Sequence, residues 1–266
     1  MKGYLPNLLI TGSSGFIGSN LTSYLSAKNY SWEGWSLSNK KDIFDEELEQ
    51  HIRKSDVVVH LAALTSVENS FKDPLEYMRI NILGTAKIVY LCNKYKKKLI
   101  YPSTAAIYHA DLSPYAKSKA IAENIVESMI KSFPVTIFRF QNVFGSNMNP
   151  NSGSIMYSFL TNKRLIVYGD GEQTRDYIHV DDVVRIIEDS FKKKWDGEIV
   201  DVGMGQAYSV NYVAGLFSHF RNIPIEYEPP RREIKWSIAD TAMLKTLYKK
   251  PLTTNLELDI QQLCQT

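Results

Sequence analysis

Tyr115 and Lys119 stand four residues apart in the segment SPYAKSKA, which has the pattern of a helix start. A spacing of four places both side chains on one face of a helix. A free tyrosine, with a pKa of about 10, is a poor base at neutral pH, but a neighbouring ammonium stabilises the phenolate and lowers that pKa. The pair therefore predicts a proton-transfer unit.

Two hydroxyl side chains, Ser103 and Thr104, follow an apolar run at Lys98–Tyr101 that is typical of a strand. Ligands of open α/β sheets bind at the carboxyl ends of the strands. A hydroxyl there can exchange a hydrogen bond with a sugar oxygen or with the Tyr115 phenol. An isolated tyrosine and lysine would be interpreted as packing and surface residues, but the neighbouring hydroxyls favour a catalytic group.

Three glycines, Gly12, Gly15 and Gly18, follow the apolar run Leu8–Thr11 and open the helical pattern Phe16–Lys28. The first glycine of such a triplet permits a tight turn, the second lets a pyrophosphate approach the backbone, and the third lets helix pack on strand. The start of the helix then offers free N–H groups to phosphate. This context favours a dinucleotide site over a turn without a ligand.

The residues after the expected second strand carry no acid, although an acidic side chain normally meets the adenosine ribose there. The run WSLSNKK instead offers Ser38 or Asn39 as partners for a 2′-phosphate, and Lys40 or Lys41 to neutralise it. The sequence therefore leans slightly toward NADP over NAD. The alternative interpretation of Lys40 and Lys41 is a solvated loop pair.

Short β-rich runs alternate with helical patterns up to residue 145, and this alternation predicts an α/β fold with a Rossmann-type, doubly wound parallel sheet. We expect residues 1–145 and 181–205 to form this dinucleotide-binding domain. Residues 146–180, which are polar and rich in turns, and residues 206–266, which look irregular, predict a small substrate-binding lobe. The expected elements are strands at 8–11, 35–37, 56–60, 98–101, 135–140 and 199–202, and helices at 16–28, 46–54, 74–95, 114–132 and 181–194.

The composition excludes several classes of protein. The 266 residues hold 31 basic and 29 acidic side chains, and this near balance predicts no nucleic-acid or membrane partner. No apolar run approaches the roughly 20 residues that span a bilayer. Two cysteines cannot form a disulfide framework, so we expect a reduced, cytoplasmic compartment. The histidines lack metal-ligand spacing with cysteines or acids, so no metal site is expected.

These motifs together resemble the extended short-chain dehydrogenase/reductases, in particular the nucleotide-sugar epimerase/dehydratase group. The similarity covers nearly the whole chain and includes the Tyr115 and Lys119 pair. The other matching segments are TGSSGFIG (11–18), HLAA (60–63), NILGT (81–85), STAAIY (103–108), RFQNVFG (139–145) and GDGEQTRDYIHV (169–180).

The resemblance implies a nicotinamide-dependent reaction at C4 of a hexose, with Thr104, Tyr115 and Lys119 as catalytic residues. It also implies that Lys119 contacts the nicotinamide ribose and that Asp42 meets the adenine. Together with the residues discussed above, the expected cofactor-binding set is Gly12, Gly15, Phe16, Ile17, Gly18, Ser38, Asn39, Lys40, Asp42, Ile43, Leu61, Ala62, Ala63, Asn81, Tyr115 and Lys119.

The substrate-binding residues implied by the resemblance are Thr104, Asn142, Arg175 and either Arg231 or Arg232, of which we favour Arg232. Arginine suits a diphosphate because its planar fork binds phosphate oxygens bidentately. A surface ion pair is the alternative interpretation of Arg232.

The chain departs from the family in three places. Only three residues separate Ser38 from Asp42, which bears on ribose recognition, and only ten separate Thr104 from Tyr115, which predicts a more open sugar pocket. Members that remove water across C5–C6 carry an Asp-Glu pair directly after the catalytic hydroxyl. Ala105 and Ala106 stand there in this chain and can neither protonate a leaving hydroxyl nor take the C5 proton, so dehydratase activity is disfavoured.

We therefore expect a nucleotide-sugar 4-epimerase that acts through a transient 4-keto intermediate, with Tyr115 as acid and base. The alternative is an NADPH-dependent reductase of a 4-keto-6-deoxy nucleotide sugar. A non-catalytic nucleotide-binding regulator is disfavoured by the intact tyrosine, lysine and threonine set. The resemblance also implies a homodimer through the helices at 74–95 and 114–132, and polysaccharide assembly would suit the class.

We expect structural roles for three further residues. Asp181 and Asp182 precede a helix and are expected to be N-caps. His179 is expected to be a hydrogen-bonded packing residue rather than a ligand.

Overall fold

The structure, a computed structural model, describes residues 5–150, 153–231 and 233–265. The chain divides into two compact units. Unit 1 comprises Met1–Arg139 and Val184–Val200, and unit 2 comprises Phe140–Val183 and Asp201–Thr266. Within the described ranges, no helix is both long and apolar enough to cross a membrane.

Unit 1 is built on a six-stranded sheet with the order β2-β1-β3-β4-β5-β9. β1 pairs in parallel with β2 and β3, and β3 pairs in parallel with β4, which confirms the predicted parallel sheet. The strands are β1 (Leu8–Thr11), β2 (Trp32–Trp35), β3 (Val57–His60), β4 (Lys98–Thr104), β5 (Val135–Phe140) and β9 (Glu198–Val202). The valines of β3 suit this position because a central strand is covered on both faces.

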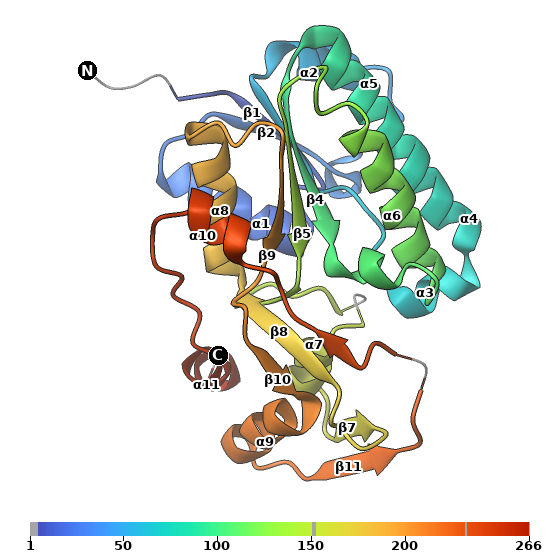
Figure 1. The fold of residues 1–266 in the computed structure, drawn as a ribbon, viewed down its shortest axis with the longest axis vertical. Coiled ribbons are helices and arrows are strands. Elements are labelled where there is room, and N and C mark those ends of the chain that lie inside the picture. Colours follow the sequence, from blue (N-terminus) through green and yellow to red (C-terminus); the bar gives the residue numbers. More distant parts are fainter. Residues whose placement is uncertain (1–4, 151–152, 232, 266) are drawn as a thin grey trace. The chain divides into compact units, whose positions relative to one another are not determined.

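Helices cover both faces of this sheet (Figure 1). On one face, α2 (Leu48–Lys54), α5 (Thr85–Tyr95) and α6 (Pro114–Glu127) bury apolar side chains against the strands, in one continuous core. On the other face lie α1 (Phe16–Ala27) and α8 (Val180–Lys192). The strand ends that carry Gly12 and Thr104 are therefore held between two helical layers.

Glu188 ties the second helical layer together. Its carboxylate accepts hydrogen bonds from Tyr24 (2.7 Å), Lys28 (2.9 Å), Tyr30 (3.0 Å) and Lys192 (2.6 Å). Burial alone would raise the pKa of Glu188, but these donors lower it to about 2. The charge that α8 buries is thus compensated by donors from α1 and from its own next turn.

The segment 74–95 is helical, but it is not the single α-helix that we expected. It consists of α4 (Pro74–Tyr77), a π-helical segment at Met78–Gly84 and α5. The wider π-helical turn carries Asn81, whose amide bonds the Leu64 backbone. Such turns occur frequently at functional sites, and apolar periodicity does not distinguish them from an α-helix. A short helix, α3 (Val67–Lys72), precedes this segment.

Unit 2 centres on β8 (Thr174–His179). β10 (Ala207–Ser209) pairs with it in antiparallel fashion, whereas β12 (Trp236–Ser237) and β6 (Asn142–Phe144) pair with it in parallel. A separate parallel pair joins β7 (Leu165–Tyr168) to β11 (Ile225–Glu228). The helices of the unit are α7 (Ile155–Thr161), α9 (Val210–Arg221), α10 (Ala242–Leu247) and α11 (Leu256–Gln265).

Two expectations about unit 2 are wrong. Residues 174–179 form a central strand rather than part of a turn-rich segment, and residues 206–266 contain three strands and three helices rather than irregular chain. Asp176 explains the first error, because its buried carboxylate accepts backbone hydrogen bonds from Met204 (2.8 Å), Gly205 (2.8 Å) and Ala239 (3.1 Å). A charged residue in a strand is thus satisfied by partners that local sequence does not reveal.

The expected role of Asp182 as an N-cap is also wrong. α8 begins at Val180, so Asp182 lies inside its first turn. Its buried carboxylate instead accepts hydrogen bonds from the backbone of Thr253 (2.9 Å) and Thr254 (2.7 Å). Asp182 therefore holds the chain that leads into α11.

Candidate active site

The glycine turn after β1 is shaped by what the glycines contact. Gly12 has a φ of +69°, and a Cβ atom built on it would lie 2.6 Å from the backbone nitrogen of Ala62. A Cβ on Gly18 would collide with the carbonyl oxygen of Gly12. Gly15 is exposed, and a Cβ atom built on it would have only the Gly12 carbonyl oxygen nearby, at 3.2 Å. Two of the glycines therefore permit close backbone packing, and Gly15 leaves the turn open.

The first turn of α1 is available to an anion. Gly15 is its N-cap and supplies no side-chain hydrogen bond to the free N–H groups of the turn. Phe16 and Ile17, both half-buried, begin this turn. Uncapped N–H groups beside Gly15, which has no side chain, fit the pyrophosphate of a dinucleotide.

A hydrogen-bonded chain fixes the segment that follows β3. The Thr11 hydroxyl lies 2.7 Å from His60 Nδ1 and accepts a hydrogen bond from the Ala62 amide at 3.2 Å. His60 Nε2 lies 3.2 Å from the Thr85 hydroxyl. Burial, together with the charge of Lys119, lowers the pKa of His60 to about 3, so this imidazole is neutral. The half-buried Leu61–Ala63 segment is thereby held against the glycine turn.

Asn81 holds the same segment from the other side. Its amide accepts a hydrogen bond from the Leu64 nitrogen (2.9 Å) and donates to the Leu64 oxygen (3.0 Å) and the Ser118 hydroxyl (2.9 Å). The side chain is buried and all three of its bonds go to protein groups. In this arrangement Asn81 shapes the wall formed by Leu61–Ala63.

The expected ribose end lies in a short turn after β2. The Ser36 hydroxyl bonds Asn39 Oδ1 (3.1 Å) and lies 3.0 Å from the Ser38 hydroxyl. Lys41 is committed to an ion pair with Glu33 (2.8 Å), whereas Lys40 is exposed. Of the two lysines, Lys40 therefore remains the better candidate to meet a 2′-phosphate.

Asp42 and Ile43 follow this turn. The Asp42 carbonyl accepts a 2.7 Å hydrogen bond from the Trp35 indole, and its carboxylate caps the Phe44 nitrogen at 3.0 Å. Ile43 is buried beside Gly84, where an added Cβ would collide with the Ile43 side chain. The position of Asp42 is thus fixed by the sheet and by its own turn.

Thr104 and Tyr115 meet at the end of β4. Thr104 ends the strand and accepts a 3.2 Å hydrogen bond from the Ala106 nitrogen, and its side chain lies near enough to that of Tyr115 to lower the pKa of the phenol. Ser113 caps α6 and Pro114 begins it, so Tyr115 lies in the first turn. Neighbouring Ser103 is buried, and its hydroxyl has no hydrogen-bond partner among the described residues. The hydroxyl of Thr104, rather than that of Ser103, is therefore the one that reaches the phenol.

Lys119 lies one turn beyond Tyr115, and both side chains are buried. Its Nζ atom donates a 2.8 Å hydrogen bond to the Pro102 carbonyl and lies 4.4 Å from the centre of the Tyr101 ring. Burial lowers the pKa of Lys119 to about 7, although the charge of Glu123 raises it. A lysine with such a pKa can change its protonation state near neutral pH.

The pKa of Tyr115 differs from our expectation. We expected Lys119 to lower it, but burial raises it, the nearby Thr104 side chain lowers it, and Tyr77 raises it. The reason is geometric, because the Lys119 ammonium bonds Pro102 rather than the phenol. In this arrangement the Tyr115 phenol is a weaker acid than the phenol of a free tyrosine.

Apart from Thr104, the expected substrate residues belong to unit 2. Arg175 donates a 3.1 Å hydrogen bond to Glu233, and Arg231 lies 3.8 Å from the same carboxylate and 4.2 Å from the centre of the Tyr168 ring. Burial lowers the pKa of Arg175, against the charge of Glu233. Arg232 lies outside the described residues. Two arginines therefore share one carboxylate in this cluster.

Asn142 begins β6, also in unit 2. Its amide donates a 3.3 Å hydrogen bond to the Asp176 carbonyl, which belongs to the neighbouring strand β8. His179 ends β8, accepts a 3.3 Å hydrogen bond from the Asp181 nitrogen and packs edge-on against Phe144. This confirms the expected packing role of His179.

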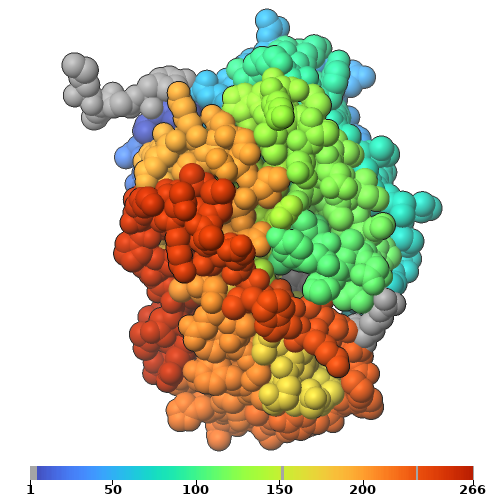
Figure 2. All heavy atoms as spheres, viewed as in Figure 1, coloured from blue at the N-terminus to red at the C-terminus, as the bar shows by residue number. Residues whose placement is uncertain are grey.

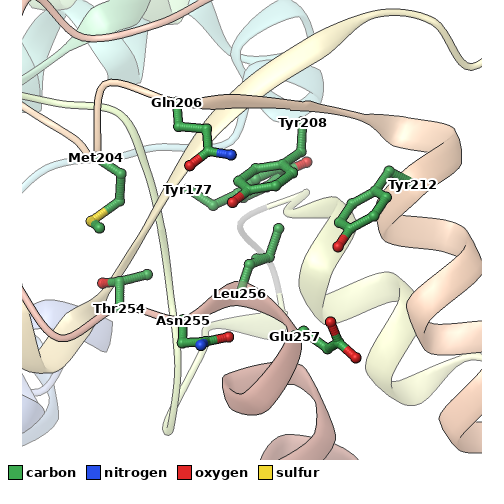
Figure 3. A pocket seen from close by; sticks show the side chains of 9 residues that line it. All are labelled: Tyr177, Met204, Gln206, Tyr208, Tyr212, Thr254, Asn255, Leu256 and Glu257. Carbon is green, nitrogen blue, oxygen red and sulfur yellow. The ribbon is translucent and has the colours of Figure 1, made fainter.

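Unit 2 also contains a pocket of about 260 Å³ that holds none of the expected site residues. Figure 3 shows its walls, which come from β8, β10 and the helices α9 and α11. Tyr208 and Tyr212 stack at 5.2 Å on one side. Tyr177 is buried, and its hydroxyl has no partner among the described residues. The lining residues are Tyr177, Met204, Gln206, Tyr208, Tyr212, Thr254, Asn255, Leu256 and Glu257.

The patterns in the sequence did not predict the roles of two residues, Glu123, which extends the face of α6 carrying Tyr115 and Lys119, and its partner Arg139. Glu123, four residues beyond Lys119, is buried, and Arg139 contacts one of its oxygens at 2.7 and 2.8 Å. The repeat of a third polar residue at four-residue spacing on α6 was a signal for Glu123. Within the described ranges, no group of three or more histidines, cysteines and acidic residues could hold a metal ion.

Comparison with known proteins identifies the family. The NAD dependent epimerase/dehydratase family matches residues 8–203, and the chain belongs to this family. It is 33% identical over 254 residues to a dTDP-D-glucose 4,6-dehydratase of Dictyostelium discoideum, covering 75% of this chain and 58% of that protein. It is 29% identical over 296 positions to a putative UDP-glucose 4-epimerase of Methanocaldococcus jannaschii, covering 96% of this chain and 95% of that protein.

A solved structure supports the same conclusion. The UDP-glucose 4-epimerase of Thermotoga maritima, in complex with UDP-glucose, superposes with a TM-score of 0.89 and 26% identity, covering 97% of each chain. This similarity confirms the fold of a parallel sheet with a smaller C-terminal mixed sheet. The relatives include an epimerase and a dehydratase, so the family consists of nucleotide-sugar enzymes that use NAD(P). Membership of the family does not by itself distinguish epimerisation from dehydration.

Proposed function

We propose that this chain is an NAD(P)-dependent nucleotide-sugar 4-epimerase. The observation that carries the proposal is the meeting of Thr104 and Tyr115 at the end of β4, with Lys119 one turn further along α6. Ala105 and Ala106 follow Thr104 and present only methyl groups. The site therefore has a group that can move the O4 proton but, at these two positions, none that can remove water.

The protein residues divide the proton chemistry among them. Thr104 orients the sugar O4 by a hydrogen bond, and Tyr115 takes the O4 proton as C4 is oxidised and returns it after the keto sugar has turned. Lys119 supplies the positive charge that balances the phenolate. A bound nicotinamide would supply the reversible hydride transfer at C4 that this proton chemistry accompanies.

The glycine turn would hold this cofactor. Gly12, Gly15 and the first turn of α1 would bind the pyrophosphate, Leu61–Ala63 would line the cofactor, and Asp42 would meet the adenine. The preference for NADP rests on Lys40, because Lys41 is neutralised by Glu33. We retain NADP as the proposed preference, with NAD as the alternative.

The arginines of unit 2 would bind the diphosphate of the substrate. Arg175 is largely buried and is held by Glu233, so its guanidinium is pre-oriented at little cost in side-chain entropy. Arg232 and Asn142 remain further candidates for the same task. The relative from Thermotoga maritima was solved with UDP-glucose, which supports a sugar linked to a nucleoside diphosphate as the substrate class.

One observation favours the reductase as a second candidate. Burial raises the pKa of Tyr115, so the phenol holds its proton more strongly than a free tyrosine does. A phenol in that state is suited to donate a proton to the O4 of a 4-keto sugar. In that reaction the cofactor would enter reduced and leave oxidised with each turnover.

The two candidates differ in what the purified protein carries and consumes. Mass spectrometry of the co-purifying dinucleotide, followed by incubation with UDP-glucose and UDP-N-acetylglucosamine, separates them. An epimerase would hold oxidised cofactor and form the C4 epimer without added cofactor. A reductase would form no epimer and would consume NADPH only with a 4-keto sugar.

We also propose that two copies of the chain pair through the face formed by α4, the π-helical turn, α5 and α6. Figure 2 shows the green atoms of this part of unit 1 lying at the surface. Large apolar side chains are exposed there, namely Leu75, Met78, Leu83, Tyr90 and Ile121. A surface of this kind marks a protein contact. Sedimentation analysis of the wild type and of Leu83→Glu tests the proposal, which expects a dimer and a monomer, respectively.

A further inference from the structure

Tyr115, Lys119 and Glu123 form a ladder on α6, with three residues between successive members. All three side chains are buried, and Glu123 is only 2% exposed. Buried carboxylates are costly unless their charge and both oxygens are satisfied. The carboxylate at the third position of this ladder therefore requires an explanation.

Arg139, on β5, provides part of it. Its Nε and Nη2 atoms lie 2.8 and 2.7 Å from Glu123 Oε1, and its Nη1 atom donates a 2.9 Å hydrogen bond to the Tyr108 hydroxyl. Both contacts with Glu123 go to the same oxygen. Glu123 Oε2 is buried and has no hydrogen-bond partner within the described part of the chain. The arginine therefore binds one edge of the carboxylate and leaves the other edge free of hydrogen bonds.

The nearest buried cation along α6 is Lys119, one turn before Glu123. Lys119 bonds a neutral carbonyl, that of Pro102, so it has no direct ion pair with a carboxylate. Unlike charges one helical turn apart attract each other, and the attraction is strong when both are shielded from water. The charge of Glu123 thus acts on Lys119 through space.

We propose that Glu123 is a positioning residue whose negative charge keeps Lys119 protonated. The inference rests on the proposed function for the task of Lys119. Arg139 in turn keeps Glu123 ionised and fixes the orientation of its carboxylate.

The balance of charges around Lys119 supports this role. Burial lowers the pKa of Lys119 to about 7, and the charge of Glu123 raises it. The loss of Glu123 would therefore leave Lys119 mostly neutral at pH 7. The titratable groups on the elements packed around Lys119 are Tyr115 and Glu123 on α6, Tyr101 on β4, His60 on β3, Tyr77 on α4, Tyr108 after β4 and Arg139 on β5.

The test uses Glu123→Gln in the full-length protein, because glutamine keeps the shape and removes the charge. NMR titration of ¹³Cε-labelled lysine, with the Lys119 signal assigned by Lys119→Arg, measures the Lys119 pKa. We expect it to fall by at least about one pH unit. The phenol pKa, from the ultraviolet titration of each protein minus its Tyr115→Phe counterpart, should stay at its wild-type value, because the phenol loses its proton only at a pH at which Lys119 is already neutral.

Glu127→Gln is the matched control, since Glu127 lies one turn further along α6 and is exposed. This variant should leave the pKa values of Lys119 and of the phenol unchanged. Glu123→Asp, which keeps the negative charge, should retain a Lys119 pKa close to that of the wild type. If Glu123→Gln fails to fold, the double variant Glu123→Met, Arg139→Met replaces the buried pair by apolar groups of similar length. The Lys119 pKa should fall in that variant also.

An unchanged Lys119 pKa in a folded variant that lacks the Glu123 charge would overturn the inference. The titrations need no substrate, so they stand apart from the proposed function. A protein that turns over no nucleotide sugar, but whose Lys119 pKa falls in Glu123→Gln, would contradict the proposed function and leave the role of Glu123 intact.

Discussion

The Nζ atom of Lys119 lies 2.8 Å from the carbonyl oxygen of Pro102, and this hydrogen bond joins the face of α6 to the strand that ends in Thr104. The bond explains why Thr104 and Tyr115 meet, because it sets the first turns of the helix against the end of β4. It also directs the ammonium toward the backbone instead of the phenol. The site thus carries a fixed geometry and a lysine whose charge depends on its surroundings.

Tyr115→Phe is expected to lower turnover by about 10²- to 10⁴-fold, because the variant loses the group that moves the O4 proton. Binding of dinucleotide and of nucleotide sugar should survive, since the phenyl ring keeps its packing against Tyr77. Steady-state kinetics and calorimetric titration measure the two effects. Tyr227→Phe, on an exposed tyrosine of β11, is the control and should be unaffected. Near-normal turnover of Tyr115→Phe would reject the assignment.

The sequence was informative wherever a local pattern determines the structure. The valines of β3 and the glycines at 12, 15 and 18 predicted a parallel sheet and a tight turn that opens a helix, and the structure contains both. The spacing of Tyr115 and Lys119 predicted a shared helical face, which α6 provides. Each of these features depends on residues within one turn or one strand.

Features that depend on distant partners could not be predicted. β8 contains Asp176, whose charge obscures the strand pattern, and its three backbone donors come from more than 25 residues away. The direction of the Lys119 ammonium is set by Pro102, and the partner of Glu123 is on another strand. Local spacing places such side chains on a face but does not say which atom they bond.

Gly12→Ala should destabilise the protein and abolish dinucleotide binding. Its φ of +69° strains any residue with a Cβ, and that atom would lie 2.6 Å from the Ala62 nitrogen. Backbone strain of this kind costs about 1–3 kcal/mol, to which the contact with Ala62 adds. Urea unfolding measures the free energy. Gly215→Ala, where an added Cβ meets nothing within 4 Å, is the control; equal stability of the two variants would contradict the argument.

Lys40→Ala tests the proposed preference for NADP. Removing one exposed charge that meets the 2′-phosphate should weaken NADP binding about tenfold, or roughly 1.4 kcal/mol, and leave NAD binding unchanged. Fluorescence titration of both dinucleotides measures this, with Lys54→Ala as the control on another exposed lysine. A wild-type protein that binds NAD more tightly than NADP would show that the preference is wrong.

His60 should make the protein sensitive to acid. In the unfolded chain a histidine binds its proton near pH 6.5, whereas in the folded chain His60 stays neutral down to about pH 3. Because the unfolded state binds more protons over this interval, His60 lowers the free energy of unfolding as the pH falls from 6.5 toward 3, by up to about 1.4 kcal/mol per pH unit.

Urea unfolding at pH 7.5 and 5.0 measures this dependence. His60→Gln should be less stable than the wild type at pH 7.5, and its stability should fall less on acidification. His219→Gln, on an exposed histidine of α9, should retain the wild-type dependence. A slope that His60→Gln does not reduce would show that another group is responsible.

The most direct test of the central claim follows the hydrogen atom on C4 of the substrate. UDP-glucose or UDP-N-acetylglucosamine deuterated at C4 is incubated with the purified protein, and the product is analysed by NMR and mass spectrometry. The account predicts a C4 epimer that retains deuterium at C4, and none from Tyr115→Phe, because the hydride leaves and returns at one carbon. Deuterium at another carbon of the sugar, or its loss to solvent, would contradict it.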